Sequence, residues 1–270
     1  MSGARSWQSG EVAVSRGCLG WHRTGGAKPP LVLVHGLTDN GLCWSRLAAA
    51  LAVRFDVIML DARGHGASTR VPDDESVDPV QDLAEAVAGL GLSRAIFAGH
   101  SVGARAVAGF AAQHPECAKL VILEDPPLLP PFTGEQLALR RAQFRAHVAE
   151  LQAESEAQLV ARCARQSPDW HGSDIPDWAA AKHQVDPRAL PEFRTRWQDD
   201  FAGITVPTLL IAGVPALGSM VGDRELAQAL ALAPQMHAAR IAGAGHNVRR
   251  ENFEAYLAAM WQFIDANELP

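Results

Sequence analysis

Short apolar segments recur along the first half of the chain and again near its end, and each stops at a glycine or a polar residue. Apolar runs of this length are typical of strands that are buried on both faces, as in a parallel sheet. The clearest of them are residues 31–34, 55–60, 94–98, 120–123 and 206–212.

Longer segments rich in alanine and leucine separate these strands and predict helices at residues 43–53, 80–90 and 102–113. Strands that alternate with helices indicate βαβ units. We therefore predict an α/β fold with a mostly parallel twisted sheet and helices on both of its faces. Residues 11–14 and 18–22 predict a short antiparallel lead-in.

The alternation stops between residues 126 and 203, where no strand-like run occurs and helical character dominates over residues 135–166 and 177–183. This pattern predicts a helical cap, residues 126–203, inserted into a core made of residues 1–125 and 204–270. Strand–helix alternation then resumes over residues 225–232, 237–241 and 252–266.

Composition narrows the class of protein. The 270 residues are 48% hydrophobic and 20% charged, which favours a large core and excludes global disorder. A net charge of −6 disfavours nucleic acid as a partner. The cysteines are scattered and residues 1–10 lack an apolar leader pattern, so we expect a cytoplasmic protein. No long uncharged apolar run occurs, so we expect no membrane span. No pattern indicates an oligomeric state.

A serine lies between a predicted strand and a predicted helix, in the pentapeptide Gly99-His100-Ser101-Val102-Gly103. Glycines on both sides permit a sharp turn, which would expose the hydroxyl at a helix N-terminus. Ser101 is therefore the candidate nucleophile, although it would also serve as a plain helix N-cap. His246 follows two nearby glycines and precedes the last helix, so it is the candidate general base.

In their order along the chain, these motifs resemble those of the α/β-hydrolase superfamily: His35-Gly36, Asp61-Ala62-Arg63-Gly64-His65-Gly66-Ala67-Ser68, the serine pentapeptide and Gly245-His246. The resemblance implies an oxyanion hole made by the backbone N–H groups of Leu37 and Val102. It is specific for the fold and much less so for the substrate, because similar proteins include esterases, thioesterases, lactonases and carbon–carbon bond hydrolases.

The orienting acid departs from the family pattern. Relatives commonly carry an acid one or three positions after the glycine that ends the post-cap strand, and this chain has Val214 and Ala216 there. Glu124 and Asp125 follow the strand that precedes the cap instead. Because neighbours in an extended segment point to opposite sides, only one of them would face the site.

We favour Asp125 as the acid, since Pro126 would fix the turn after it, and place Glu124 second. Alternatively, Asp125 only ties loops together. Asp223 is a third option, although its surroundings look more like a helix N-cap.

The predicted pocket is apolar and is assigned to Trp44, His100 and Trp178, with a small or medium apolar acyl or carbonyl compound as substrate. No motif indicates a metal or a cofactor. The leading hypothesis is a serine hydrolase that cleaves an ester, thioester or lactone. The alternatives are a carbon–carbon bond hydrolase or lyase-like enzyme, and a ligand-binding member whose catalysis is weakened because Val214 replaces the usual acid.

Overall fold

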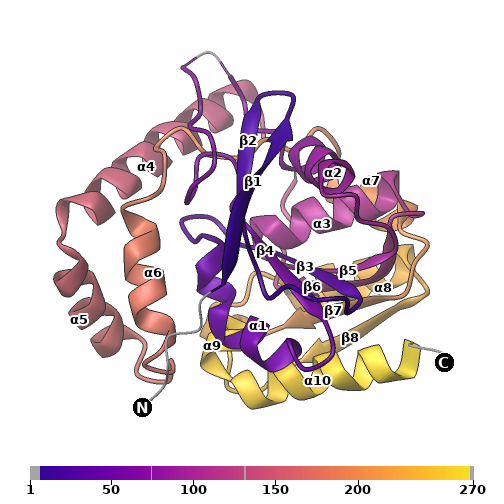
Figure 1. Cartoon of the computed structure of the whole chain (residues 1–270). Coiled ribbons are helices and arrows are strands. Elements are labelled where there is room, and N and C mark those ends of the chain that lie inside the picture. Colours follow the sequence, from indigo (N-terminus) through magenta and orange to yellow (C-terminus); the bar gives the residue numbers. More distant parts are fainter. Residues whose placement is uncertain (1–6, 74, 131, 268–270) are drawn as a thin grey trace.

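The protein is described here by a computed structural model that covers residues 7–73, 75–130 and 132–267. Its centre is an eight-stranded sheet in the order β1-β2-β4-β3-β5-β6-β7-β8 (Figure 1). The strands are β1 Gln8–Val14, β2 Gly17–Arg23, β3 Pro30–Val34, β4 Asp56–Leu60, β5 Ala95–His100, β6 Ala118–Glu124, β7 Thr208–Ala212 and β8 Met236–Arg240.

The strands from β4 to β8 in this order pair in parallel, and β1 and β2 join them as an antiparallel ribbon at the β4 edge. The α/β fold with a mostly parallel sheet is thus confirmed, and so is the antiparallel lead-in. β3, β4, β5 and β7 are buried along almost their whole length, which explains why they lack polar–apolar alternation in the sequence.

Helices cover both faces of the sheet (Figure 1). Apolar residues of α2, α3, α7 and α8 form one core cluster, and those of α1 and α10 form a second on the opposite face. The helices are η1 Gly41–Trp44, α1 Ser45–Leu51, α2 Pro79–Gly89, α3 Val102–Gln113, α7 Trp197–Gly203, η2 Pro215–Leu217, α8 Asp223–Leu232, α9 Val248–Glu251 and α10 Phe253–Asn267.

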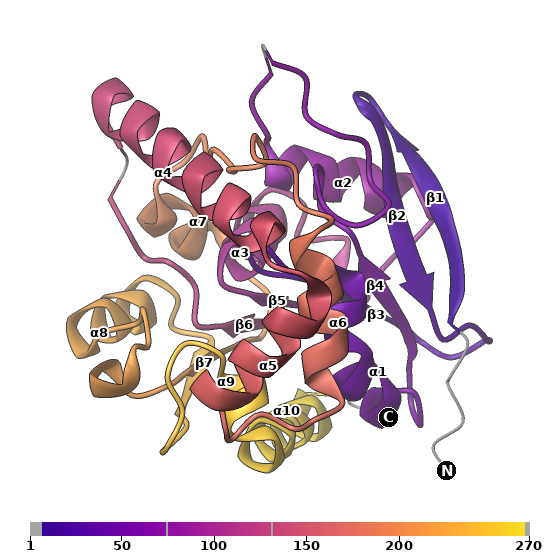
Figure 2. The ribbon, with the colours of Figure 1, turned by 90° about the vertical axis from the view of Figure 1, so that its left-hand side faces the viewer.

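Three further helices lie to one side of the sheet, at the left in Figure 1 and nearest the viewer in Figure 2. They are α4 Gly134–Ala153, α5 Glu156–Gln166 and α6 Asp174–Lys182. The helical character predicted over residues 135–166 is divided between α4 and α5, because Ser155 starts α5 with its own capping box. Helix α7 was expected in the cap, yet Trp197 and Phe201 pack with the core cluster of α3. The division into core and cap remains a prediction. Residues 1–6, 74 and 268–270 of the predicted core and residue 131 of the predicted cap lie outside the described residues.

The direction in which successive strands are added to the sheet reverses at β3, although the strands themselves stay parallel. β3 pairs with β4 on one side and with β5 on the other, so the loops that leave β3 and β5 diverge. Ligand sites of open α/β sheets lie in such a crevice, beyond the carboxyl ends of the strands. The loop after β3 begins at His35, and Ser101 follows β5, so both reach this crevice.

Two glycines allow the chain to turn between β5 and α3. A Cβ at Gly99 would lie 2.5 Å from the carbonyl oxygen of Gly103, and a Cβ at Gly103 would overlap the carbonyl oxygens of Val34 and His35. The turn therefore tolerates no side chain at either position.

Gly103→Ala is expected to destabilise the fold by about 1–3 kcal/mol, because the added methyl group must displace backbone atoms at the end of β3. Urea unfolding of wild type and variant would measure the difference. Gly172→Ala is the matched control, since a Cβ there meets nothing within 4 Å. Equal stability of the two alanine variants would contradict the packing argument.

Candidate active site

Ser101 occupies the turn between β5 and α3 with strained backbone angles, φ 54° and ψ −124°. A non-glycine residue at positive φ is uncommon and is often found at functional sites. The Ser101 N–H donates to the carbonyl oxygen of Glu124 at 2.9 Å, which fixes the turn against the end of β6. The side chain thus projects from a rigid elbow rather than from a flexible loop.

His246 lies in the loop between β8 and α9, and its ring Nδ1 is 2.6 Å from Oδ2 of Asp125. Asp125 is fully buried just after β6. Its two carboxylate oxygens also accept from the Ser219 hydroxyl at 2.5 Å and from the Met220 N–H at 2.8 Å. The carboxylate is therefore held in a fixed orientation facing His246.

This contact selects one tautomer of the imidazole. When Nδ1–H donates to Asp125, the lone pair of neutral His246 resides on Nε2, and that is the nitrogen a general base uses in serine hydrolases. The structure therefore brings together His246 and the first of the three carboxylates proposed from the sequence.

The other carboxylates have different partners. Glu124 is fully buried and accepts from the backbone N–H of Arg249 at 3.0 Å and from its guanidinium at 3.1 Å. Burial raises the pKa of Glu124, although Arg249 opposes the shift. Asp223 is exposed and pairs with Arg240 at 2.9 Å. Gly222, not Asp223, is the N-cap of α8.

Relatives commonly carry the acid at the end of β7. In this chain the end of β7 instead supports the histidine loop, which is the loop between β8 and α9 that carries His246. The N–H of Val214 donates to the carbonyl oxygen of Ala244 at 2.6 Å. Gly213 lies so close that a Cβ would overlap the Gly245 carbonyl oxygen. This strand end thus positions the backbone that leads into His246, without supplying a carboxylate.

The loop after β3 carries the proposed oxyanion donor Leu37. The ring of His35 shapes this loop: Nδ1–H donates to the Gly36 carbonyl oxygen at 2.8 Å, and Nε2 accepts from the Ala62 N–H at 2.9 Å. Burial lowers the pKa of His35, in keeping with this neutral form. Among the hydrogen bonds of the described residues, none uses the N–H of Leu37 or of Val102.

The predicted pocket residues occupy different places. Trp44 was expected to line the pocket, but it is fully buried in the core cluster of α1 and α10, with the guanidinium of Arg249 3.9 Å from its ring centre. That expectation was wrong, because the apolar side chains on the α1 and α10 face of the sheet bury the indole. Trp178 lies on α6, with its ring 6.1 Å from that of Trp170.

His100 contacts the histidine loop rather than an open pocket. Its Nε2 is 3.0 Å from the carbonyl oxygen of His246, and the two rings lie 4.8 Å apart. Burial, followed by the positive charge of Arg249, holds the pKa of His100 well below its usual range. His100 is therefore a neutral donor to the backbone of His246.

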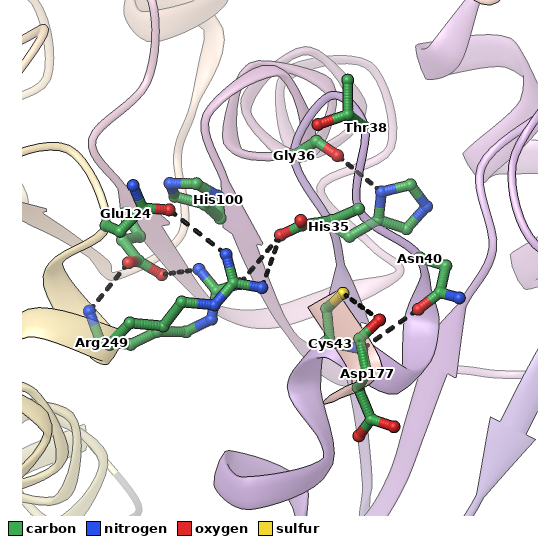
Figure 3. A network of polar contacts seen from close by, with 12 residues as sticks. His35, Gly36, Thr38, Asn40, Cys43, His100, Glu124, Asp177 and Arg249 are labelled. Atoms are coloured by element: carbon green, nitrogen blue, oxygen red, sulfur yellow. Dashed lines mark hydrogen bonds and ion pairs between the residues drawn. The ribbon is translucent and has the colours of Figure 1, made fainter. Parts of the chain in front are cut away.

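Sequence reasoning missed a cluster of buried charges beside the site (Figure 3). Asp39, two residues after Leu37, accepts from Arg250 at 2.9 Å, from Lys182 at 3.0 Å and from Arg249 at 3.4 Å. Burial alone would raise the pKa of Asp39, but Arg250, Lys182 and Arg249 together hold it well below its usual range. The sequence did contain a signal for this cluster, because Asp39 closely follows the His35 motif and Arg249 and Arg250 closely follow the His246 motif.

A hollow of about 420 Å³ lies away from these residues, beside α4. Its lining is mostly charged and contains neither Ser101 nor His246. No group of three or more His, Cys, Asp or Glu among the described residues is arranged to hold a metal ion. None of the described helices combines the length and apolar character needed to cross a membrane.

Comparison with known proteins places these observations in a family. A family model described as alpha/beta hydrolase fold matches residues 29–248. An N-formylmaleamate deformylase of Pseudomonas putida and a 2-(acetamidomethylene)succinate hydrolase of Mesorhizobium japonicum are each 28% identical, over 90% of this chain and 91% of their own. The crystal structure of an E-2-(acetamidomethylene)succinate hydrolase matches with a TM-score of 0.76 and 25% identity, over 96% of this chain and 99% of that one.

Asp125→Asn is expected to slow reaction at Ser101 by about 10²–10⁴-fold, because the amide favours the wrong tautomer of His246 and does not stabilise the imidazolium. The rate of covalent labelling by an alkyl fluorophosphonate, followed by intact mass, measures the effect. Asp223→Asn is the control and should label like wild type, since Asp223 is exposed and pairs with Arg240. A loss below threefold for Asp125→Asn would rule out its role as the acid.

Proposed function

The chain belongs to the alpha/beta hydrolase fold family, and we propose that it is a serine hydrolase that cleaves a small or medium-sized acyl compound through an acyl-enzyme on Ser101. In this proposal His246 is the general base, Asp125 is the acid that orients it, and the N–H groups of Leu37 and Val102 form the oxyanion hole. The substrate is an ester, thioester or lactone.

The contact between Asp125 and His246 is the observation that carries the proposal. Without an orienting carboxylate, a serine hydrolase loses on the order of 10⁴-fold in rate. The hypothesis of a weakened, ligand-binding member rested on Val214 at the usual acid position. The 2.6 Å contact from Asp125 Oδ2 to His246 Nδ1 weighs against that hypothesis.

The proposed reaction has two halves. The Ser101 oxygen attacks the carbonyl carbon of the substrate as its proton passes to Nε2 of His246, and the negative charge that forms on the carbonyl oxygen is bound by the two backbone N–H groups. The bond to the leaving group breaks as His246 returns the proton to that group. Water then attacks the acyl-enzyme, again giving its proton to His246, and the acid product leaves as the proton returns to Ser101.

A second candidate activity is cleavage of an N-acyl bond in a small molecule that carries carboxylates. The two relatives that match most of this chain favour it, because one is named for removing a formyl group from a nitrogen and the other for hydrolysing an acetamido compound. The same catalytic residues would serve, with nitrogen as the leaving group. A carbon–carbon bond hydrolase stays an alternative and would turn over simple esters poorly.

The test can be made before the substrate is identified. Purified wild-type protein treated with an alkyl fluorophosphonate should gain a single label within minutes, because the phosphorus reacts with an activated serine hydroxyl and fluoride leaves. Ser101→Ala should gain none, whereas Ser173→Ala, which changes an exposed cap serine, should label like wild type. Wild-type protein that stays unlabelled for hours would reject the proposed nucleophile.

If labelling occurs, the same preparation can be offered p-nitrophenyl esters and N-formyl or N-acetyl enamides that carry carboxylates. Ester turnover well above that of the enamides supports the leading proposal, and the reverse preference supports the second.

A further inference from the structure

We propose that Lys182, the last residue of cap helix α6, is a positioning residue that holds the oxyanion loop in place from the cap. The oxyanion loop is defined here as residues 37–43. This inference rests on the proposed function, because it assigns Leu37 of that loop to the oxyanion hole.

The ammonium group of Lys182 directs its hydrogen bonds to this loop. Its Nζ donates to the carbonyl oxygen of Thr38 at 2.8 Å, to the hydroxyl of Thr38 at 3.1 Å and to Oδ1 of Asp39 at 3.0 Å. A lysine has three N–H donors, so all of them find an acceptor. The residue is only 2% exposed, although lysine is seldom fully buried. A buried lysine of this kind fixes the geometry of the groups that it binds.

The backbone at Thr38 needs such support. Its φ of 65° lies in the left-handed region, where a β-branched side chain is strained. Leu37 lies between two fixed points, because His35 binds the Gly36 carbonyl oxygen and Lys182 binds the Thr38 carbonyl oxygen. The peptide that carries the Leu37 N–H is held at the Gly36 carbonyl oxygen by His35 and by the Asp39 N–H, and Lys182 holds the peptide that follows Thr38. The contact from the cap therefore limits how far the backbone around Leu37 can shift.

Other contacts join the same loop to the cap, and Figure 3 draws the one between Cys43 and Asp177. The Leu37 side chain packs on a cluster that contains Phe144 and Val148 of α4. The side-chain amide of Asn40 donates to that of Gln184 at 2.8 Å, just after α6. Cys43 Sγ lies 3.7 Å from the Asp177 carbonyl oxygen. The loop that supplies the proposed oxyanion donor is therefore part of the interface between core and cap.

Removal of the lysine need not unfold the protein, because Asp39 keeps its contacts with Arg249 and Arg250. It would, however, free the carbonyl oxygen and the hydroxyl of Thr38, so the strained turn at Thr38 could relax and shift the Leu37 N–H from its position. Oxyanion donors act only at about 2.7–3.1 Å from the charged oxygen, and loss of one costs about 10²–10³-fold in rate. A loosened donor should cost less than a deleted one.

The experiment measures fluorophosphonate labelling of Lys182→Met at several reagent concentrations and pH values. The limiting labelling rate should fall by about 10–100-fold, while the half-saturating concentration changes by less than threefold. The pH midpoint of labelling should stay at its wild-type value, because the Asp125–His246 pair is untouched. A merely structural role would lower the thermal midpoint and leave the labelling rate of folded protein unchanged.

Lys28→Met is the matched control, since Lys28 is exposed and binds only the Ala52 carbonyl oxygen among the described contacts. It should label like wild type. A Lys182→Met rate within twofold of wild type would overturn the inference alone, whereas unlabelled wild-type protein would overturn the proposed function and this inference with it. If Lys182→Met does not fold, Gln184→Ala decides, because Gln184 is exposed: a two- to fivefold slower rate supports the connection, and an unchanged rate overturns it.

Discussion

The buried carboxylate of Asp39 is the interaction on which the arrangement of the site depends. It joins three segments that are far apart in the sequence. Asp39 itself lies in the loop after β3, helix α9 contributes Arg249 and Arg250, and helix α6 contributes Lys182. Burying a charge costs free energy unless the charge is paired, so the Asp39 carboxylate and its cationic partners must be buried at the same place. Loss of Asp39 would take the anionic partner from Lys182 and Arg250, whereas Arg249 would keep its contact with Glu124. The positions of the loop after β3 and of the segment that carries His246 are thereby coupled to the position of α6.

Features encoded locally could be predicted from the sequence. The strands were recognisable as apolar runs, because residues buried on both faces need no polar alternation. The elbow at Ser101 was visible for a similar reason, since a sharp turn between a strand and a helix requires glycines at fixed offsets. Chain order and local geometry also pointed to Asp125, whose side chain in the structure contacts His246 whereas that of Glu124 contacts Arg249.

What the sequence did not reveal depends on contacts between distant segments. Trp44 follows the oxyanion loop and looked like a pocket wall, but the packing of α1 and α10 buries it. Trp197 and Phe201 fall within the helical insertion by pattern, yet they pack on α3 in the core. The partners of Lys182 lie 143 and 144 residues away in sequence. No local periodicity carries that information, so only the folded chain displays the buried charges.

The position of the proposed acid also bears on how such chains can be recombined. Ser101 and Asp125 both precede the helical insertion, and only His246 follows it. Consider a crossover just after Asp125 with a relative that carries its acid after the post-cap strand. One chimera would inherit two acids and the other, with Val214 at that position, would inherit none. A single crossover between the two kinds of chain is therefore asymmetric: one product keeps a redundant carboxylate, and its reciprocal lacks an orienting group for the histidine.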